Sequence, residues 1–178
     1  LLGAESDLLT AIACEPSHLS WYQLTIEPNT VFHKRPPQLP VEDELADIQL
    51  CGEQLLPATG YGQYEVSAFS QRVYKCRHNS NYWSFGDYVG IGAGAHGKIS
   101  FLDGHIERYA KRRQPEEYMS AAPGNFVAST RTLEKAEIVG EFMMNALRQN
   151  DGFTLQEFVS RTGLDRAQLE PRLESLCQ

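Results

Sequence analysis

The chain has 178 residues and a formal net charge of −7, and its composition, with 42% hydrophobic and 22% charged residues, is that of an ordinary globular protein. The negative charge argues against a protein whose main partner is nucleic acid, because phosphate binding needs a surplus of Lys and Arg. No apolar run approaches the roughly 18 residues of a membrane helix, so we expect no stable membrane insertion.

The N-terminal half alternates predicted helices and strands. An amphipathic helix is predicted for residues 5–14, and a strand rich in aromatic and β-branched residues for residues 18–26. A second helix is predicted for residues 41–59, with Pro57 in its last turn, and a short strand for residues 63–67. This order, with short connections, indicates parallel α/β units in a barrel or an open sheet.

The C-terminal half begins with a stretch, residues 70–86, that has no regular periodicity. A short strand at residues 88–91 then leads into a glycine-rich turn, and a hairpin is predicted around Asp103-Gly104. The remaining predicted elements are helices at residues 115–119, 132–149, 154–162 and 165–176, the last two with helix-turn-helix spacing. Because residues 150–178 hold more carboxylates than arginines, we expect this pair to pack or to bind a protein rather than DNA.

The first candidate site is the polar and aromatic run around His78. A porphyrin needs a neutral imidazole for its iron, flat apolar walls and cations for its propionates. His78 offers the imidazole, Tyr82 and Trp83 offer the walls, and Arg77 or residues 111–113 offer the cations. The alternative is a loop held by a buried His and Asn, in which Trp83 is a core anchor.

The second candidate site is the glycine-rich turn, which has four glycines within residues 90–97. Glycine lets the backbone approach a ligand or a neighbouring element closely. The spacing differs from G-x-G-x-x-G because His96 and a hairpin follow, so a nucleoside-sized ligand is favoured over a dinucleotide. The alternative is a tight sheet edge. Thr25 and Glu27, at the end of another predicted strand, either face a ligand as well or serve as caps and ion-pair partners.

The four cysteines are widely spaced, at positions 14, 51, 76 and 177, and no close pair exists. This spacing argues against a zinc knuckle or a self-contained iron–sulfur site. A disulfide framework is also disfavoured at this density. We therefore predict free thiols in a cytoplasmic protein.

Taken together, these runs resemble the HemW family, the haem-binding radical S-adenosylmethionine (SAM) relatives of the oxygen-independent coproporphyrinogen III oxidases. The matching runs are H-L-S-W-Y-Q-L-T-I-E-P-N-T at residues 18–30, Y-E-V-S at 64–67, H-N-x-x-Y-W at 78–83 and D-Y-V-G-I-G-A-G-A-H-G at 87–97. The resemblance covers nearly all of residues 1–165 and keeps the family's order of motifs, and the H-N-x-x-Y-W run separates the family from the true oxidases.

The resemblance implies a cytoplasmic chaperone that binds haem and passes it to acceptor proteins. The implied haem contacts are His78, Asn79, Tyr82 and Trp83, with His78 as the candidate ligand of the iron, and the implied SAM contacts are Thr25, Gly92, Gly94, Ala95 and His96. The family holds a [4Fe–4S] cluster on a C-x-x-x-C-x-x-C motif that this sequence lacks. SAM and the cluster are therefore expected in the full-length parent, and this chain alone is not expected to perform radical chemistry. The alternative function is radical decarboxylation of coproporphyrinogen III.

The fold class implied by the resemblance is α/β. Residues 1–97 are expected to form a partial TIM-like radical SAM barrel, and residues 98–113 a β-hairpin or linker. Residues 114–178 are expected to form a small helical, winged-helix-like domain. The chain starts without Met, and we expect it to be a C-terminal fragment, truncated at both ends.

Overall fold

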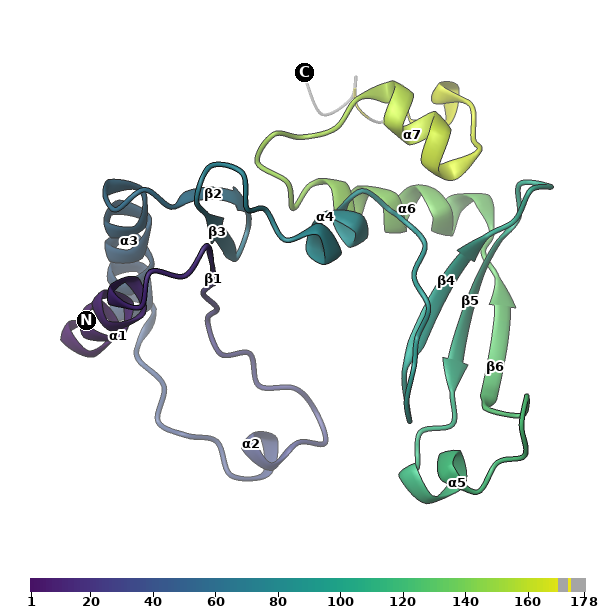
Figure 1. Ribbon diagram of the computed structural model, residues 1–178, viewed down its shortest axis with the longest axis horizontal. Helices are drawn as coiled ribbons and strands as arrows, with labels where there is room; N and C mark the ends of the chain where they lie inside the picture. Colours follow the sequence, from purple (N-terminus) through teal and green to yellow (C-terminus); the bar gives the residue numbers. More distant parts are fainter. Residues whose placement is uncertain (170–172, 174–178) are drawn as a thin grey trace. The chain divides into compact units, whose positions relative to one another are not determined.

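The computed structural model describes residues 1–169 and residue 173, and the chain divides into two compact units at Cys76/Arg77 (Figure 1). The first unit contains α1 (Leu2–Ala13), β1 (His18–Ser20), α2 (Val31–Lys34), α3 (Glu42–Ala58), β2 (Gly62–Glu65) and β3 (Ala68–Ser70). The second contains α4 (Arg77–Trp83), β4 (His96–Ser100), β5 (Ile106–Lys111), α5 (Pro115–Met119), β6 (Val127–Thr132), α6 (Lys135–Ala146), α7 (Leu155–Thr162) and the 3-10 helix η1 (Arg166–Gln168).

The first sheet is antiparallel, so the prediction of a parallel sheet is wrong. Its strand order is β1-β3-β2, and β3 runs antiparallel to both neighbours. Strands β1 and β2 therefore point in the same direction, as the helix-strand-helix-strand order predicts, but β3 lies between them. The expected strand at residues 18–26 is also shorter, because only His18–Ser20 pairs with β3.

The core of the first unit lies between its helices and its sheet. Leu8 from α1, Leu56 from α3, Tyr61 and Phe69 are buried there. The helix predicted for residues 41–59 is confirmed as α3, which ends at Ala58. Pro57 lies in the last turn, and Gly60 follows with a φ of 92°, a conformation that glycine adopts at little cost.

The second sheet contains the predicted hairpin, with Asp103-Gly104 at its turn. Strands β4 and β5 pair antiparallel, and Gly104 has a φ of 91°. A third strand, β6, pairs antiparallel with β5. The sequence did not predict β6, whose six residues are all exposed and so show no alternation of apolar and polar side chains. The strand expected at residues 88–91 is reduced to a bridge between Tyr88 and Lys98.

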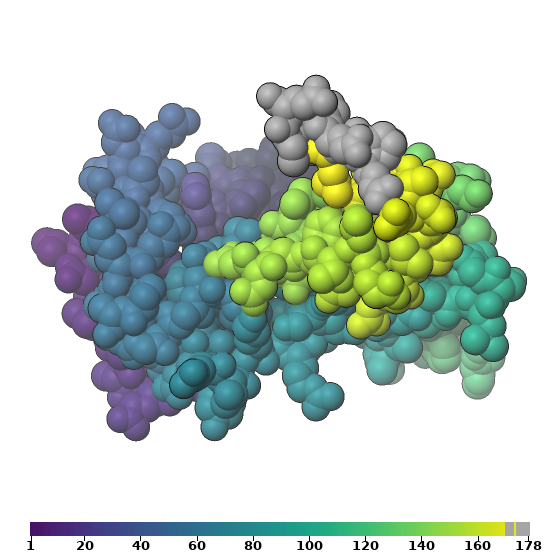
Figure 2. All heavy atoms as spheres, turned by 90° about the horizontal axis from the view of Figure 1, so that it is seen from above, coloured from purple at the N-terminus to yellow at the C-terminus, as the bar shows by residue number. Residues whose placement is uncertain are grey.

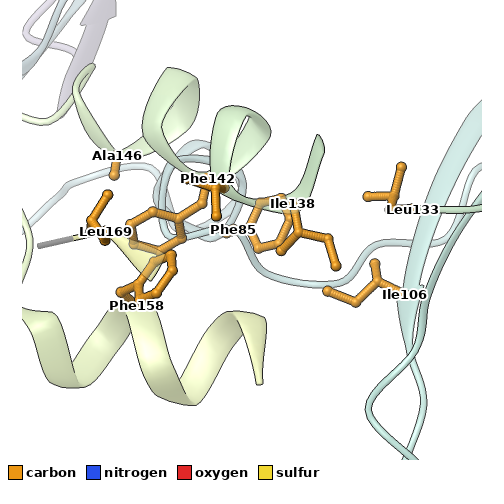
Figure 3. Close-up of a cluster of buried hydrophobic side chains, with 9 residues drawn as sticks. Phe85, Ile106, Leu133, Ile138, Phe142, Ala146, Phe158 and Leu169 are labelled. Carbon is orange, nitrogen blue, oxygen red and sulfur yellow. The ribbon is translucent and has the colours of Figure 1, made fainter. Parts of the chain in front are cut away.

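The core of the second unit is built largely from α6 and α7. Phe142 and Phe158 meet at 5.1 Å between ring centroids, and Phe142 also packs on Phe85, which follows α4 (Figure 3). Ile106 and Leu133 extend the cluster to the sheet. Helix α7 lies along α6 in both views of the molecule (Figures 1 and 2).

The helix boundaries follow their capping residues. Helix α6 is shorter than the predicted 132–149, because β6 extends to Thr132 and the helix is capped by Glu134. Helix α7 is confirmed, with Thr154 as its N-cap and Gly163 as its left-handed C-cap. Of the helix expected at residues 165–176, the structure describes η1, and most of the remainder lies outside the described residues. No helix in the described part is long and apolar enough to cross a membrane.

Candidate functional site

The predicted haem-binding residues lie on the short helix α4, rather than in the irregular segment that the sequence suggested. His78 and Tyr82 are four residues apart and share one face of the helix. Their rings meet edge to face, with centroids 4.8 Å apart and planes at 71°. The His78 side chain is exposed, so an imidazole nitrogen is available to a ligand approaching from solvent.

The ring of Tyr82 continues into a row of aromatic side chains. Its centroid lies 4.3 Å from that of Tyr88, which precedes the glycine-rich turn. Burial and the neighbouring Tyr88 raise the pKa of the Tyr82 phenol, and Arg108 opposes this only in part. The raised pKa favours the protonated phenol, which can donate a hydrogen bond or present a flat wall to a ligand.

Trp83 follows Tyr82 by one residue and so points about 100° further round the helix. The guanidinium of Arg148 lies 4.4 Å from the centre of its ring, and Gln149 donates a hydrogen bond to its backbone oxygen at 3.2 Å. The indole Nε1 is buried and has no hydrogen-bond partner in the described part of the chain. Trp83 thus attaches α4 to the segment after α6, and Asn79 is half-buried on the same helix.

The end of α4 is fixed by a tight turn at Phe85 and Gly86. Phe85 has a positive φ of 55°, and Gly86 donates its N–H to the backbone oxygen of Asn81 at 2.7 Å. A Cβ on Gly86 would collide with the side chain of Asn81, which in turn donates to the backbone oxygen of Asp87 at 2.9 Å. The turn therefore requires glycine at this position.

An ion pair between buried Lys98 and exposed Asp87 joins this turn to the hairpin. Lys98 is 1% exposed, and its Nζ donates to the backbone oxygen of Phe85, to Oδ1 of Asp87 and to Oγ of Ser100. Burial lowers the pKa of Lys98, since the charged form loses water. Burial opposes ionisation of Asp87, but hydrogen bonds from Lys98 and Ser100 outweigh it and lower the pKa of the carboxyl.

This ion pair predicts a pH dependence of stability. Because the folded pKa of Asp87 lies below its ordinary value of 3.8, its ionised form stabilises the fold above that value and the contribution is lost as the pH falls through the folded pKa. We expect Asp87→Asn to destabilise the protein at neutral pH and the stability gap from wild type to shrink at acidic pH. Urea unfolding of both proteins across this pH range measures the gap, and a constant gap would contradict the assignment.

The glycine-rich turn uses several of its own backbone donors internally. Gly90 donates its N–H to the Tyr109 hydroxyl at 2.8 Å, Gly92 donates to the Tyr118 hydroxyl at 3.3 Å, and Gly94 donates to the backbone oxygen of Arg112 at 2.8 Å. Gly92 and Gly94 have positive φ values of 105° and 71°. The hairpin and α5 therefore set the shape of the turn.

The predicted SAM contacts are distributed over both units. Thr25 is an exposed residue of the first unit, in a segment without regular secondary structure. Gly92, Gly94, Ala95 and His96 belong to the second unit, where Ala95 accepts a hydrogen bond from the N–H of Lys111 at 2.8 Å and His96 is exposed. The turn and Lys111 lie at the end of the second sheet that carries α5, whereas α4 lies beside α6 (Figure 1).

The described cysteines do not fit an iron–sulfur cluster. Cys14, Cys51 and Cys76 are free thiols, and among residues 1–169 and 173 no group of three or more His, Cys, Asp or Glu side chains is arranged to hold a metal ion. Cys177 lies outside the described residues.

Three residues in contact with the predicted site were not found from sequence. Tyr88 packs on Tyr82, Arg108 donates a hydrogen bond to the Tyr88 hydroxyl, and Glu141 accepts one from Arg108. Tyr88 stands within the glycine-rich run, but no spacing rule relates it to Tyr82. Arg108 and Glu141 read as ordinary polar positions of a hairpin and a helix. Their contacts depend on how β5 and α6 pack, and periodicity along the sequence carries no signal for such a pairing.

Comparison with known proteins gives related sequences and one related fold. No family model matches the chain. It is 50% identical over 171 residues to the protein named haem chaperone HemW of Escherichia coli, covering 96% of this chain and 44% of that protein. It is 44% identical over 175 residues to the haem chaperone HemW of Haemophilus influenzae, covering 98% of this chain and 45% of that protein.

A solved structure of coproporphyrinogen III oxidase (HemN) from Escherichia coli, described as a radical SAM enzyme, matches with a TM-score of 0.64. The identity is 15%, and the match covers 90% of this chain and 41% of the oxidase. At this identity the likeness concerns the fold alone, which is the expected α/β class. The chain spans less than half the length of the curated relatives it matches.

Proposed function

We propose that this chain, a homologue of the HemW haem chaperones over nearly its whole length, supplies the haem-binding face of such a chaperone. The resemblance expected from the four sequence runs is confirmed. The observation that carries the proposal is the exposed imidazole of His78 on the same helical face as Tyr82, within the H-N-x-x-Y-W run.

The donor set fits haem as a cargo. In the proposal, His78 coordinates the iron through an imidazole nitrogen, and the ring of Tyr82 packs beside the macrocycle with its phenol protonated. Trp83 holds α4 against the segment after α6, and Asn79 lies next to the bound haem. Arg77 is the exposed first residue of α4 and is better placed for a propionate than residues 111–113. Those residues lie at the end of β5 that leads to α5, away from α4 (Figure 1).

The remaining parts of the proposal concern the full-length protein. There, residues 1–97 contribute to a radical SAM barrel, the hairpin at residues 98–113 connects it to a winged-helix-like domain at residues 114–178, and a cluster on the missing motif accompanies SAM. Thr25, Gly92, Gly94, Ala95 and His96 line the adenosine of SAM. Haem passes from the chaperone to acceptor proteins in the cytoplasm.

Decarboxylation of coproporphyrinogen III is not favoured. The relatives of high identity are named haem chaperones, whereas the oxidase is related at 15% identity, which supports a common fold only. The H-N-x-x-Y-W run also argues against the oxidase.

Absorbance titration of the chain with ferric haem tests the proposal. We expect a saturable Soret change at one haem per chain, and weaker binding of iron-free protoporphyrin IX because it offers no metal to the imidazole. Equal binding of both porphyrins would argue against iron ligation, and absence of any saturable change would refute a haem-binding face on this chain.

A further inference from the structure

We propose that Tyr88, Arg108 and Glu141 are positioning residues for the haem-binding face of α4. The inference rests on the proposed function and adds to it, because none of the three belongs to the H-N-x-x-Y-W run. They form a continuous chain of contacts from α6, across β5, to the ring of Tyr82, and so to the imidazole of His78.

The contact chain begins at the face itself. His78 rests edge-on against Tyr82, and Tyr82 rests against Tyr88 with a centroid separation of 4.3 Å and planes tilted by 36°. A ring held on one side by another ring loses rotational freedom. The orientation of the imidazole therefore depends on where Tyr88 lies.

Tyr88 is itself held by Arg108 of β5. The Nη1 of Arg108 donates to the Tyr88 hydroxyl at 2.5 Å, and the guanidinium carbon lies 5.6 Å from the centre of the Tyr88 ring. A planar guanidinium fixes both the distance and the tilt of such a ring. Tyr88 forms a β-bridge with Lys98, and Lys98 pairs with Arg108 in the β4–β5 register. Tyr88, Lys98 and Arg108 therefore lie in one row across the sheet.

Glu141 of α6 fixes Arg108. Both Nε and Nη2 of the guanidinium donate to Oε2 of this carboxylate, at 2.9 and 2.5 Å. The two side chains are only 22% and 24% exposed, so solvent screens this pair less than a fully exposed one. Arg108 thus has defined partners on both sides and is not a free cation for a propionate.

The arrangement resembles the outer shell of a metal site. Residues behind a metal-ligating side chain set its orientation, and their removal typically costs about 10- to 100-fold in affinity. Here the shell acts through ring packing rather than through a direct hydrogen bond to the imidazole. We therefore expect effects near the lower end of this range.

The test is haem titration of the 178-residue chain carrying Tyr88→Leu, Tyr88→Phe or Glu141→Gln. Tyr88→Leu removes the ring and should weaken haem binding about tenfold. Tyr88→Phe keeps the ring, so its haem affinity should stay within about threefold of wild type. The haem affinity of Glu141→Gln should lie between those of Tyr88→Leu and Tyr88→Phe. The nitrogen-ligated fraction of ferric haem, followed by electron paramagnetic resonance, should fall in the same order.

Tyr109→Leu is the matched control. Tyr109 lies beside Arg108 on β5 and contacts the glycine-rich turn through its hydroxyl, and no ring contact joins it to α4 among the described residues. It should alter thermal stability and leave haem ligation unchanged. Circular dichroism of every variant distinguishes unfolding of the protein from a change in the orientation of His78 in a folded protein.

The outcomes distinguish the two proposals. Wild-type affinity and ligation in a folded Tyr88→Leu variant, with haem binding still dependent on His78, would overturn the positioning role and leave the proposed function standing. An equal loss of ligation in Tyr109→Leu would also overturn it. Absence of haem binding by the wild-type chain would instead overturn the proposed function.

Discussion

Replacement of His78 by Ala is expected to weaken ferric haem binding by at least 10- to 100-fold, since loss of a ligand should cost no less than loss of an outer-shell partner. The imidazole is exposed, and its main ring contact is with Tyr82, so the substitution should leave the fold intact. Absorbance titration gives the affinity, and the Soret maximum should move toward that of haem without a nitrogen ligand.

The matched control for this substitution is His105→Ala. His105 is also partly exposed, but it is stacked on Phe101 at the hairpin turn and bound to Asp103. Its removal should leave haem affinity within about twofold of wild type. If His105→Ala and His78→Ala reduced affinity equally, binding would be nonspecific to exposed imidazoles and the role of His78 would be refuted.

Replacement of Phe142 by Ala should have the largest effect on stability. Phe142 is 1% exposed and packs against the rings of Phe85 and Phe158 (Figure 3). It also touches the ring of Phe153, so it joins the turn after α4 to α6 and α7 in one core. Truncating a buried Phe costs about 3–5 kcal/mol, through lost transfer free energy and the cavity that remains. Urea unfolding followed by circular dichroism measures the change for the second unit.

Met144→Ala is the control on the same helix. Met144 is 75% exposed, so its truncation leaves no cavity and should change the free energy of unfolding by less than about 0.5 kcal/mol. A loss below about 1 kcal/mol for Phe142→Ala would show that the second unit does not depend on this core.

Local signals in the sequence were sufficient for several elements. The Asp103-Gly104 hairpin needs a positive φ at its turn, which glycine supplies. Helix α7 has a capping box from Thr154 and Glu157 and ends at Gly163. Each of these features is set by residues close together in the chain, so reading along the sequence finds them.

Elements that depend on distant partners were missed. Strand β3 is only three residues long, which is too short to show a periodic pattern in the sequence. Because it lies between β1 and β2, the sheet is antiparallel. Strand β6 is exposed along its whole length and lacks an apolar face. Helix α4 has no buried residue of its own, and it is stabilised by tertiary contacts rather than by an amphipathic pattern.

The candidate site was predicted in part for the same reason. The H-N-x-x-Y-W run identified His78 and Tyr82, which the helix places on one face. The run did not predict that Trp83 would turn toward Arg148, because that depends on the helical conformation of α4. The supporting residues Arg108 and Glu141 come from other elements, and only the packing of β5 against α6 brings them to the site.

Electron paramagnetic resonance of the ferric haem complex is the most direct test of the central claim that the His78 imidazole holds the iron. Wild-type protein prepared with ¹⁵N-labelled histidine should show hyperfine coupling from an imidazole nitrogen, and His78→Ala should lose it while remaining folded. The same nitrogen coupling in His78→Ala would contradict the account, because another histidine would then hold the iron.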